Sequence, residues 1–475
     1  MRFASYNNMC KIILKNRKAL ALLLALLLII SSTLSLTSCF DGGSSDDGTV
    51  TEEEFATLAK TLRENVDAGC TKKYSYVSSY LDYWGFPVFN SIKLKTIERY
   101  YANKYIDDVG YSSTDKLLEL AVRTANEYLE NRLPSLTLEE INSEAGSDEI
   151  IRAYVSAIGD RYSYYRDPDE HSSYTADLEG EFAGIGVYVQ LDYEAHTVTV
   201  IETIADSAAE KAGILSGDVI VEVDGTSADG VDLNVFMDLV RGEIGTPVNI
   251  TVLRDGAEIT YEIVRMQIET ESVGYELYEN GIAYVAISSF NANTDEQFIS
   301  IINMLEKTGI ITGYIFDVRY NGGGYLDTAV NLISHFVEKG TKIVSEVARN
   351  NKGWHYSNSD HVINKPMVVL CNGYTASAGE LFTAAIRDYR DAGLLNAVIV
   401  GETTYSKGKV QNIFPLSDGS SITFTIGLFN PPCDVNFDGV GIEPDLTVEY
   451  IPDPEVDNQY EAAYAELVKM INKNK

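Results

Sequence analysis

Ser377 stands where the sequence expects a strand to give way to a helix, a position from which a hydroxyl can act as a nucleophile. The string NGYTASAGE (372–380) joins the apolar run PMVVLCN to an expected helix from Ala376 to about Tyr389. Orphan N–H groups and the helix dipole stabilise negative charge at such a helix start. A serine there could equally be only a helix cap, so the chemistry depends on a base that takes its proton.

A candidate base follows in the next expected turn, TTYSKGKVQ (403–411). Lys407 and Gln411 are four residues apart, which places them on one face of either a strand or a helix. A lysine at its reference pKa of ~10.4 is a poor base at neutral pH, so Lys407 would have to be desolvated enough to be partly neutral. Gln411 could then orient its amine. A solvated surface lysine is the alternative, and no histidine lies near the serine loop in the sequence.

A glycine triplet supplies a third element of acyl-transfer chemistry. DVRYNGGG (317–324) leads from an expected strand into another helix. Glycines have no Cβ, so they let backbone N–H groups approach a substrate closely. An oxyanion hole needs such N–H donors.

The elements that must hold these loops form an α/β pattern. After Glu271, strand-like and helical runs alternate along the chain. Between residues 54 and 165 the apolar residues recur at helical spacing, which predicts a helical N-terminal region. Between 178 and 268, five short β-rich runs separated by glycine turns, with two short helices, predict one small β-rich domain. The predicted fold class is therefore α/β, or α+β taken over several domains.

The composition excludes several classes of function. A chain of 475 residues, 45% of them hydrophobic, is long enough for roughly two to four domains. Its 70 acidic and 37 basic residues give a net charge of −33, which should repel nucleic acid. The five cysteines form no disulfide framework, and neither they nor the five histidines show a structural zinc spacing. We expect no metal, no cofactor and no nucleic-acid partner.

The first forty residues have the pattern of an exported, lipid-anchored protein. A basic stretch without acids precedes an apolar run (19–30) that is too short for a confident membrane span. The run closes with LTSC, which resembles the bacterial lipobox and implies cleavage before Cys39 with a lipid on its sulfur. We expect a lipoprotein signal peptide at 1–38 and a flexible linker at 39–53. An ordinary signal peptide with a chance cysteine is the alternative.

The small β-rich domain contains GIGV (184–187), SAAEKAGILSGDVIVEVDG (207–225) and RGEIGT (241–246), which together resemble a PDZ domain. A PDZ domain binds protein C-termini. Its glycine loop directs successive N–H groups at a terminal carboxylate, and the peptide adds as a strand at the sheet edge. The residues assigned to peptide C-terminus binding are Gly184, Ile185, Gly186 and Val187.

Six strings occur in the order seen in carboxy-terminal processing (tail-specific) peptidases: GEFAGIGVYV, KAGILSGDVIVEVDG, DVRYNGGGYL, NGYTASAGE, GETTYSKGKVQ and GIEPDLTVE. The resemblance runs from about Ile158 to Glu449. That family consists of serine proteases with a Ser–Lys pair, a PDZ domain and a crotonase-like core of ββα units. The resemblance implies the following roles: Ser377 as nucleophile, Lys407 as general base, Gln411 as its support, and the N–H groups of Ala378 and of Gly323 or Gly324 as the oxyanion hole.

Some residues depart from the family pattern or invite another interpretation. Gly322 stands where the family usually has proline, and Ser406 where it usually has glycine. Arg241 is a candidate for coupling PDZ occupancy to the active site, and a plain surface arginine is the alternative. Residues 434–445 match the spacing of a calcium-binding EF-hand loop apart from the final Glu. Because Pro444 stands where a helix should begin, we favour a loop of the peptidase core.

These observations predict a serine endopeptidase that recognises unstructured, apolar protein C-termini and is anchored to the extracytoplasmic face of a bacterial cell membrane. The expected domains are a helical region (54–165), a PDZ domain (178–268), the peptidase core (271–450) and a helical tail (451–475). Homo-oligomers are an expectation from the family alone. Two alternatives stay open. One is a catalytically silent PDZ lipoprotein that captures C-termini. The other is a crotonase-type acyl-CoA enzyme, although such an enzyme would not need a PDZ domain.

Overall fold

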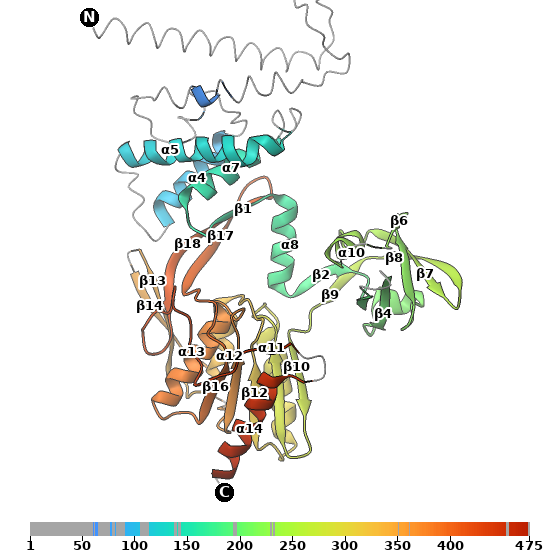
Figure 1. Ribbon diagram of the computed structural model, residues 1–475, viewed down its shortest axis with the longest axis vertical. Helices are drawn as coiled ribbons and strands as arrows, with labels where there is room; N and C mark the ends of the chain where they lie inside the picture. Colours follow the sequence, from blue (N-terminus) through green and yellow to red (C-terminus); the bar gives the residue numbers. More distant parts are fainter. Residues whose placement is uncertain are drawn as a thin grey trace, which may run out of the picture. The chain divides into compact units, whose positions relative to one another are not determined.

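The structure is a computed structural model, and it divides into two compact units (Figure 1). One unit contains 1–171, 347–351 and 409–428, and the other contains 172–346, 352–408 and 429–475. The structure describes residues 60, 62–64, 77, 81, 91–104, 114–136, 140, 144–192, 197–228, 230, 233–349, 351–360, 362–452 and 456–473. The expected signal peptide, Cys39 and the linker lie outside these residues.

The second unit is built on a six-stranded sheet with the order β10-β11-β12-β15-β16-β19. The pair β10–β11 is antiparallel and all other pairs are parallel. Every residue of β12 and β15 is buried, as expected for parallel strands covered on both faces. The strands are β10 (Val273–Leu277), β11 (Ile282–Ile287), β12 (Gly313–Asp317), β15 (Met367–Cys371), β16 (Ala397–Gly401) and β19 (Leu446–Thr447).

Helices cover both faces of this sheet because neighbouring side chains in a strand point in opposite directions. Phe316 of β12 contacts the rings of Phe298, Phe336 and Phe382. Its neighbour Ile315 belongs to the apolar cluster under α14, which crosses β12, β15 and β16 (Figure 1). The helices are α11 (Thr294–Lys307), α12 (Leu326–Ser334), α13 (Ala378–Asp391) and α14 (Asn458–Lys473). The expected α/β fold class is confirmed.

The small β-rich domain is also part of the second unit, and β3 lies at an edge of its sheet, whose order is β3-β4-β5-β7-β8 with β6 beside β5. Its apolar core includes the fully buried Val198, Val248 and Phe236. The pair β2–β9 brackets this domain at the two ends of its segment. The elements are β2 (Glu181–Gly184), β3 (Val187–Asp192), β4 (Thr197–Thr203), α9 (Ala208–Ala212), β5 (Val219–Val223), β6 (Thr226–Ser227), α10 (Leu233–Val240), β7 (Pro247–Arg254), β8 (Ala257–Val264) and β9 (Met266–Glu269).

The first unit combines the N-terminal helices with a hairpin from far along the chain. Tyr101 of α4 contacts Phe424 of β18, and Tyr100 stacks on Phe414 of β17 at 4.7 Å. The domain boundaries expected from the sequence separate these packing partners. The helix α4 falls in the expected helical region (54–165), whereas β17 falls in the expected peptidase core (271–450). The elements are α4 (Ser91–Lys104), α5 (Thr114–Glu127), a π-helical turn (Tyr128–Arg132), a 3₁₀ turn (Leu133–Ser135), α7 (Glu144–Ile158), β1 (Tyr164–Arg166), β17 (Lys409–Pro415) and β18 (Ser421–Asn430).

Four elements have residues in both units: α8 (Pro168–Glu179), β13 (Lys342–Ala348), β14 (Asn351–Tyr356) and β18. Of the cysteines that the structure describes, Cys371 is buried, Cys433 is exposed, and both are free. Across the described ranges, no helix is both long and apolar enough to span a membrane.

A buried cation organises the first unit. The Lys93 ammonium lies 2.8 Å from Asp148 and 2.7 Å from Asp418, and its side chain is 8% exposed. Burial alone would raise the pKa of the Asp418 carboxyl. Hydrogen bonds from Lys93 and Ser420 outweigh that effect and lower this pKa to about 2.

We predict that this ion pair makes the first unit sensitive to acid. The folded pKa of Asp418 lies below the unfolded value of about 3.9, so its stabilisation is full above about pH 4 and is lost as the pH falls toward 2. Urea unfolding should therefore show Asp418→Asn to be less stable than wild type at pH 6, with the difference shrinking below pH 4. Asp360→Asn, which removes a surface partner of Lys339, is the control. A difference that stays constant down to pH 2.5 would contradict this account.

Candidate active site

Three loops meet at one edge of the core sheet. The parallel strands β12, β15 and β16 are direct neighbours, so the loops that follow their carboxyl ends emerge side by side. These loops carry the glycine triplet, Ser377 and Lys407 respectively. Backbone bonds join them: Ala376 donates to the Asn321 carbonyl at 2.8 Å, and Tyr405 donates to the Thr375 carbonyl at 3.0 Å.

Ser377 occupies a strained turn between β15 and α13. Its backbone lies at φ 54° and ψ −113°, outside the regions that L-residues ordinarily adopt. Such strain persists only where surrounding contacts over-determine it, and nucleophilic serines at strand-to-helix turns show it. Ser377 is half-buried and is the N-cap residue of α13. The alternative role considered for this serine, a helix cap, therefore applies as well.

Glu380 ties the serine loop to the lysine loop. Its carboxylate is fully buried, and its Oε2 accepts the backbone N–H groups of Ser377 at 2.9 Å and Lys407 at 2.7 Å. Its Oε1 accepts the Thr404 hydroxyl and the Ser406 N–H, both at 2.6 Å. The backbones of Ser377 and Lys407 are therefore held within hydrogen-bond reach of one oxygen atom. Sequence analysis missed this role because Glu380 looks there like an ordinary residue of a capping box.

A second loop fixes Lys407 from both sides in the chain. Gly439 N–H donates to the Ser406 carbonyl at 3.0 Å, and Gly408 N–H donates to Asp438 Oδ1 at 3.1 Å. The Asn436 carboxamide donates to the Gly408 carbonyl at 2.9 Å. Ser406 itself has φ 79°, a left-handed conformation that glycine adopts more readily. Serine thus replaces the family's usual glycine at position 406 but keeps a backbone conformation typical of glycine.

The residues of the calcium-loop alternative are engaged by protein groups. Asp434 accepts the Ser345 hydroxyl at 2.7 Å and forms an ion pair with Lys352. Asp438 and Asn436 bind the lysine loop, as described above. Among the residues that the structure describes, no group of three His, Cys, Asp or Glu side chains is placed to hold a metal ion.

Gly323 lies directly against the serine. A Cβ added at Gly323 would stand 2.8 Å from the Ser377 Cβ and 3.1 Å from the Ala378 nitrogen, and its φ is 106°. Glycine is therefore required at this point of the loop. The Gly323 N–H donates to Asn321 Oδ1 at 2.9 Å, so in this structure it is bonded within its own loop. Gly324 instead packs against the Phe290 carbonyl.

Gln411 and Arg241, two further expected residues, each make a hydrogen bond within their own segment. Gln411 lies in β17, within the first unit, and its carboxamide donates to the Lys409 carbonyl at 3.1 Å. Arg241 follows α10, and its N–H donates to the Met237 carbonyl. The arginine that organises this turn is Arg265, which is buried and donates to the Val240 and Pro247 carbonyls.

The GIGV loop turns the chain from β2 into β3. The Ile185 and Gly186 carbonyls accept the N–H groups of Ala209 and Ile204, and Gly186 has φ 80°. A Cβ at Gly186 would stand 2.3 Å from the Ser207 Cβ, so only glycine fits. Val187 begins the edge strand β3.

Two other nucleophiles are less suited to the site. Cys371 precedes the serine loop, but burial raises the pKa of its thiol to about 12, so it stays protonated at neutral pH. Ser359 Oγ lies 3.0 Å from His335 Nδ1, and His335 Nε2 lies 3.5 Å from Asp295 Oδ1. This row has triad-like residue types, but Ser359 does not begin a helix. Ser377 begins α13 and lies against Gly323.

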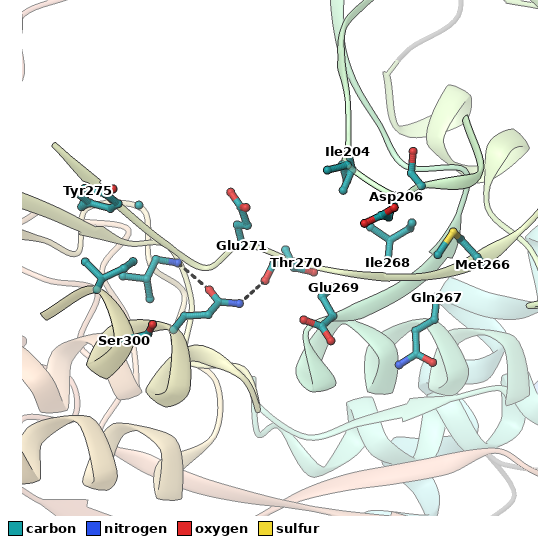
Figure 2. A pocket seen from close by; sticks show the side chains of 16 residues that line it. Ile204, Asp206, Met266, Gln267, Ile268, Glu269, Thr270, Glu271, Tyr275 and Ser300 are labelled. Carbon is teal, nitrogen blue, oxygen red and sulfur yellow. Dashed lines mark hydrogen bonds between the residues drawn. The ribbon is translucent and has the colours of Figure 1, made fainter. Parts of the chain in front are cut away.

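A separate cavity of about 850 Å³ follows β9 (Figure 2). Its lining includes Ile204 and Asp206 of the β-rich domain and Ser300 of α11. Gln297 secures the segment that crosses it, because its carboxamide donates to the Thr270 carbonyl and accepts the Ser272 N–H, both at 2.8 Å. Neither Ser377 nor Lys407 lines this cavity, so it is distinct from the candidate active site.

Comparisons with known proteins agree with this fold. Residues 281–448 match the model for peptidase family S41, and residues 183–264 match the model for a PDZ domain. The fold and the site thus define a serine-type peptidase that contains a PDZ domain.

The relatives place the chain in a family. It is 32% identical over 314 residues to the carboxy-terminal-processing protease of Bartonella bacilliformis, covering 65% of this chain and 70% of that protein. It is 33% identical over 308 residues to the carboxy-terminal processing protease CtpA of Bacillus subtilis, covering 64% of each. A solved photosystem II D1 C-terminal processing protease is 25% identical, with a TM-score of 0.44 over 75% of this chain and 93% of that chain. The chain belongs to the carboxy-terminal-processing proteases of peptidase family S41.

We predict that Glu380→Gln lowers kcat about a hundredfold and changes KM little. A glutamine has only one acceptor oxygen, so it cannot bind all four donors, and a misplacement of about 1 Å in a catalytic loop can cost about 10²-fold. Steady-state hydrolysis of a quenched fluorescent peptide measures both constants. The pH profile of kcat should also change, because the loop that carries Lys407 is released.

The matched control for this prediction is Glu402→Gln. Glu402 follows β16 and accepts the Tyr450 N–H at 2.8 Å, but it binds neither catalytic loop residue. Its replacement should leave kcat within about twofold of wild type. A Glu380→Gln protein that is folded and fully active would show that the loops do not depend on this carboxylate.

Proposed function

We propose that this peptidase is an endopeptidase in which Ser377 is the nucleophile and Lys407 the general base. The observation that carries the proposal is the single Glu380 oxygen that accepts the N–H groups of both residues. A nucleophile and its base must have side chains within hydrogen-bond reach of each other, and two backbones held on one oxygen atom favour such an approach. Gln411 is proposed to support the lysine, as the family resemblance implies.

The reaction would proceed through an acyl-enzyme. The neutral Lys407 amine takes the proton from Ser377 Oγ as that oxygen bonds to the scissile carbonyl carbon, and the carbonyl oxygen becomes an oxyanion. The Ala378 N–H, at the start of α13, is proposed to stabilise the oxyanion together with a glycine amide of the 322–324 loop. Collapse breaks the C–N bond, and the Lys407 ammonium protonates the leaving amine. Water then gives a proton to Lys407 and attacks the ester carbon. As the bond from that carbon to Ser377 Oγ breaks, the Lys407 ammonium returns the proton to Oγ, which frees the serine and the new carboxyl end.

The PDZ domain is proposed to select unstructured protein C-termini with apolar ends. The edge strand β3 pairs with β4 on one side only within its sheet, so an extended peptide can add to the other side. The GIGV loop at the start of β3 is proposed to receive the terminal carboxylate on its backbone N–H groups, as the PDZ resemblance implies. Side chains of the bound strand would then determine specificity.

The substitutions Ser377→Ala and Lys407→Ala should each lower kcat/KM by at least about a thousandfold. The assay uses the detergent-solubilised full chain and an unstructured polypeptide with an apolar C-terminus, with circular dichroism to show that each variant is folded. Amidation of the substrate C-terminus should raise KM for wild type, because the PDZ domain would lose its carboxylate.

Ser359→Ala is the control, since it removes a serine hydroxyl that lies 3.0 Å from His335 Nδ1. It should keep the wild-type rate. If Ser359→Ala is inactive while Ser377→Ala is active, the assignment of the nucleophile is wrong. If wild type is inert yet binds the free C-terminus, the alternative of a C-terminus capture protein is supported.

The mature protein is proposed to be held on the extracytoplasmic face of a bacterial membrane by a lipid on Cys39. The support is the LTSC string after a signal-like segment, followed by an acidic spacer. A strongly acidic chain would have little non-specific attraction to an anionic membrane surface, so a specific anchor is needed.

Mass spectrometry of the protein from bacterial membranes should find an N-terminus at Cys39 with a diacylglyceryl group. Cys39→Ala should move the protein out of the membrane fraction, because a lipid anchor contributes most of its membrane affinity. Cys10→Ala, earlier in the same segment, is the control and should leave the distribution unchanged. A wild-type protein without lipid that stays in the membrane would contradict the anchor.

A further inference from the structure

Two exposed tyrosines stack beside the active site. The rings of Tyr320 and Tyr374 have centroids 5.5 Å apart and an interplanar angle of 20°. The two residues are 60% and 68% exposed, so the stack leaves much of each ring open to solvent. A single exposed aromatic residue is ordinary, but a fixed pair on catalytic loops calls for a physical reason.

One buried side chain holds both tyrosines in place. Asn372 is 3% exposed, and its Oδ1 accepts the N–H groups of Tyr320 at 3.0 Å and Tyr374 at 3.1 Å. Tyr320 also has φ 60°, which glycine or asparagine adopts at lower cost. The backbone therefore does not favour a tyrosine at this position, and the reason for one must lie in its ring.

The pair lies close to Ser377 and to the glycine packed against it. Tyr374 precedes Ser377 by three residues, and Tyr320 precedes Gly323, whose backbone lies against Ser377, by three residues. Three residues of extended chain span at most about 11 Å, so a substrate residue within about three positions of the scissile bond can reach the rings. Tyr405, on the lysine loop, is 45% exposed and is bonded through its backbone to Thr375.

We propose that Tyr320 and Tyr374 form a subsite for an aromatic or large apolar side chain near the scissile bond of the substrate. The exposed ring faces favour such a side chain by stacking and by removal of apolar area from water. This specificity element is separate from the PDZ domain, which would read the chain end. The inference rests on the proposed function in that Ser377 marks where the substrate lies.

A binding experiment tests the subsite without turnover. The Ser377→Ala full chain is titrated with fluorescein-labelled, C-terminally amidated decapeptides of alanine and glycine that carry Phe or Ser at one central position. Amidation removes the carboxylate that the PDZ domain would bind. The Phe peptide should bind about tenfold more tightly than the Ser peptide. Adding Tyr320→Asn and Tyr374→Ser should reduce that ratio to less than about twofold.

Variants separate the rings from the fold. Asparagine at 320 keeps a residue that tolerates positive φ, so the loop is not strained further. Tyr320→Phe with Tyr374→Phe keeps both rings and should keep the preference for Phe. Tyr356→Ser removes a tyrosine of comparable exposure (48%) on β14 and should leave the preference unchanged.

The same peptides tested for cleavage by the Ser377 enzyme should show the preference in kcat/KM. Equal binding of the Phe and Ser peptides by the Ser377→Ala chain, or a preference that survives loss of both rings, would overturn the subsite. A preference for Phe in binding, with no cleavage of any peptide by the Ser377 enzyme, would uphold the subsite and refute the proposed peptidase mechanism.

Discussion

The carboxylate of Glu380 is fully buried, and its four hydrogen-bond donors are three backbone amides and one hydroxyl. A buried carboxylate is costly unless such donors surround it, so the fold must keep all four in place. The donors come from the serine loop and the lysine loop, which follow adjacent strands of the core sheet. Satisfying one side chain therefore positions the two groups that the proposed chemistry requires. The strained backbone of Ser377 is held by the same contact.

Other contacts extend this arrangement outward. Asn321 joins the glycine loop to the serine loop, and the 436–439 loop holds the residues on both sides of Lys407. Asn372 orients two exposed tyrosines at the rim. These contacts all include a backbone group, so the geometry of the site depends on main-chain positions.

The sequence predicted much of this from local patterns. The alternation after Glu271 indicated the α/β core, and the residue types around Ser377 indicated a strand-to-helix turn with a glycine loop beside it. The role of Glu380 was not predictable, because its partners at 404–407 are more than twenty residues away and only the sheet brings them near. The stacking of Tyr320 on Tyr374 is hidden for the same reason. The hairpin of β17 and β18 packs on N-terminal helices some 300 residues earlier, which no local pattern reveals.

The central claim is that the hydrogen bonds of Glu380 hold the serine and lysine loops so that Ser377 is the reactive serine. The most direct measurement is reaction of the full chain with a small fluorophosphonate, followed by intact mass and peptide mapping. The account predicts a single adduct, on Ser377, and no adduct in the Ser377→Ala chain. An adduct on Ser359 or another residue, or no adduct on a chain that cleaves peptides, would contradict it.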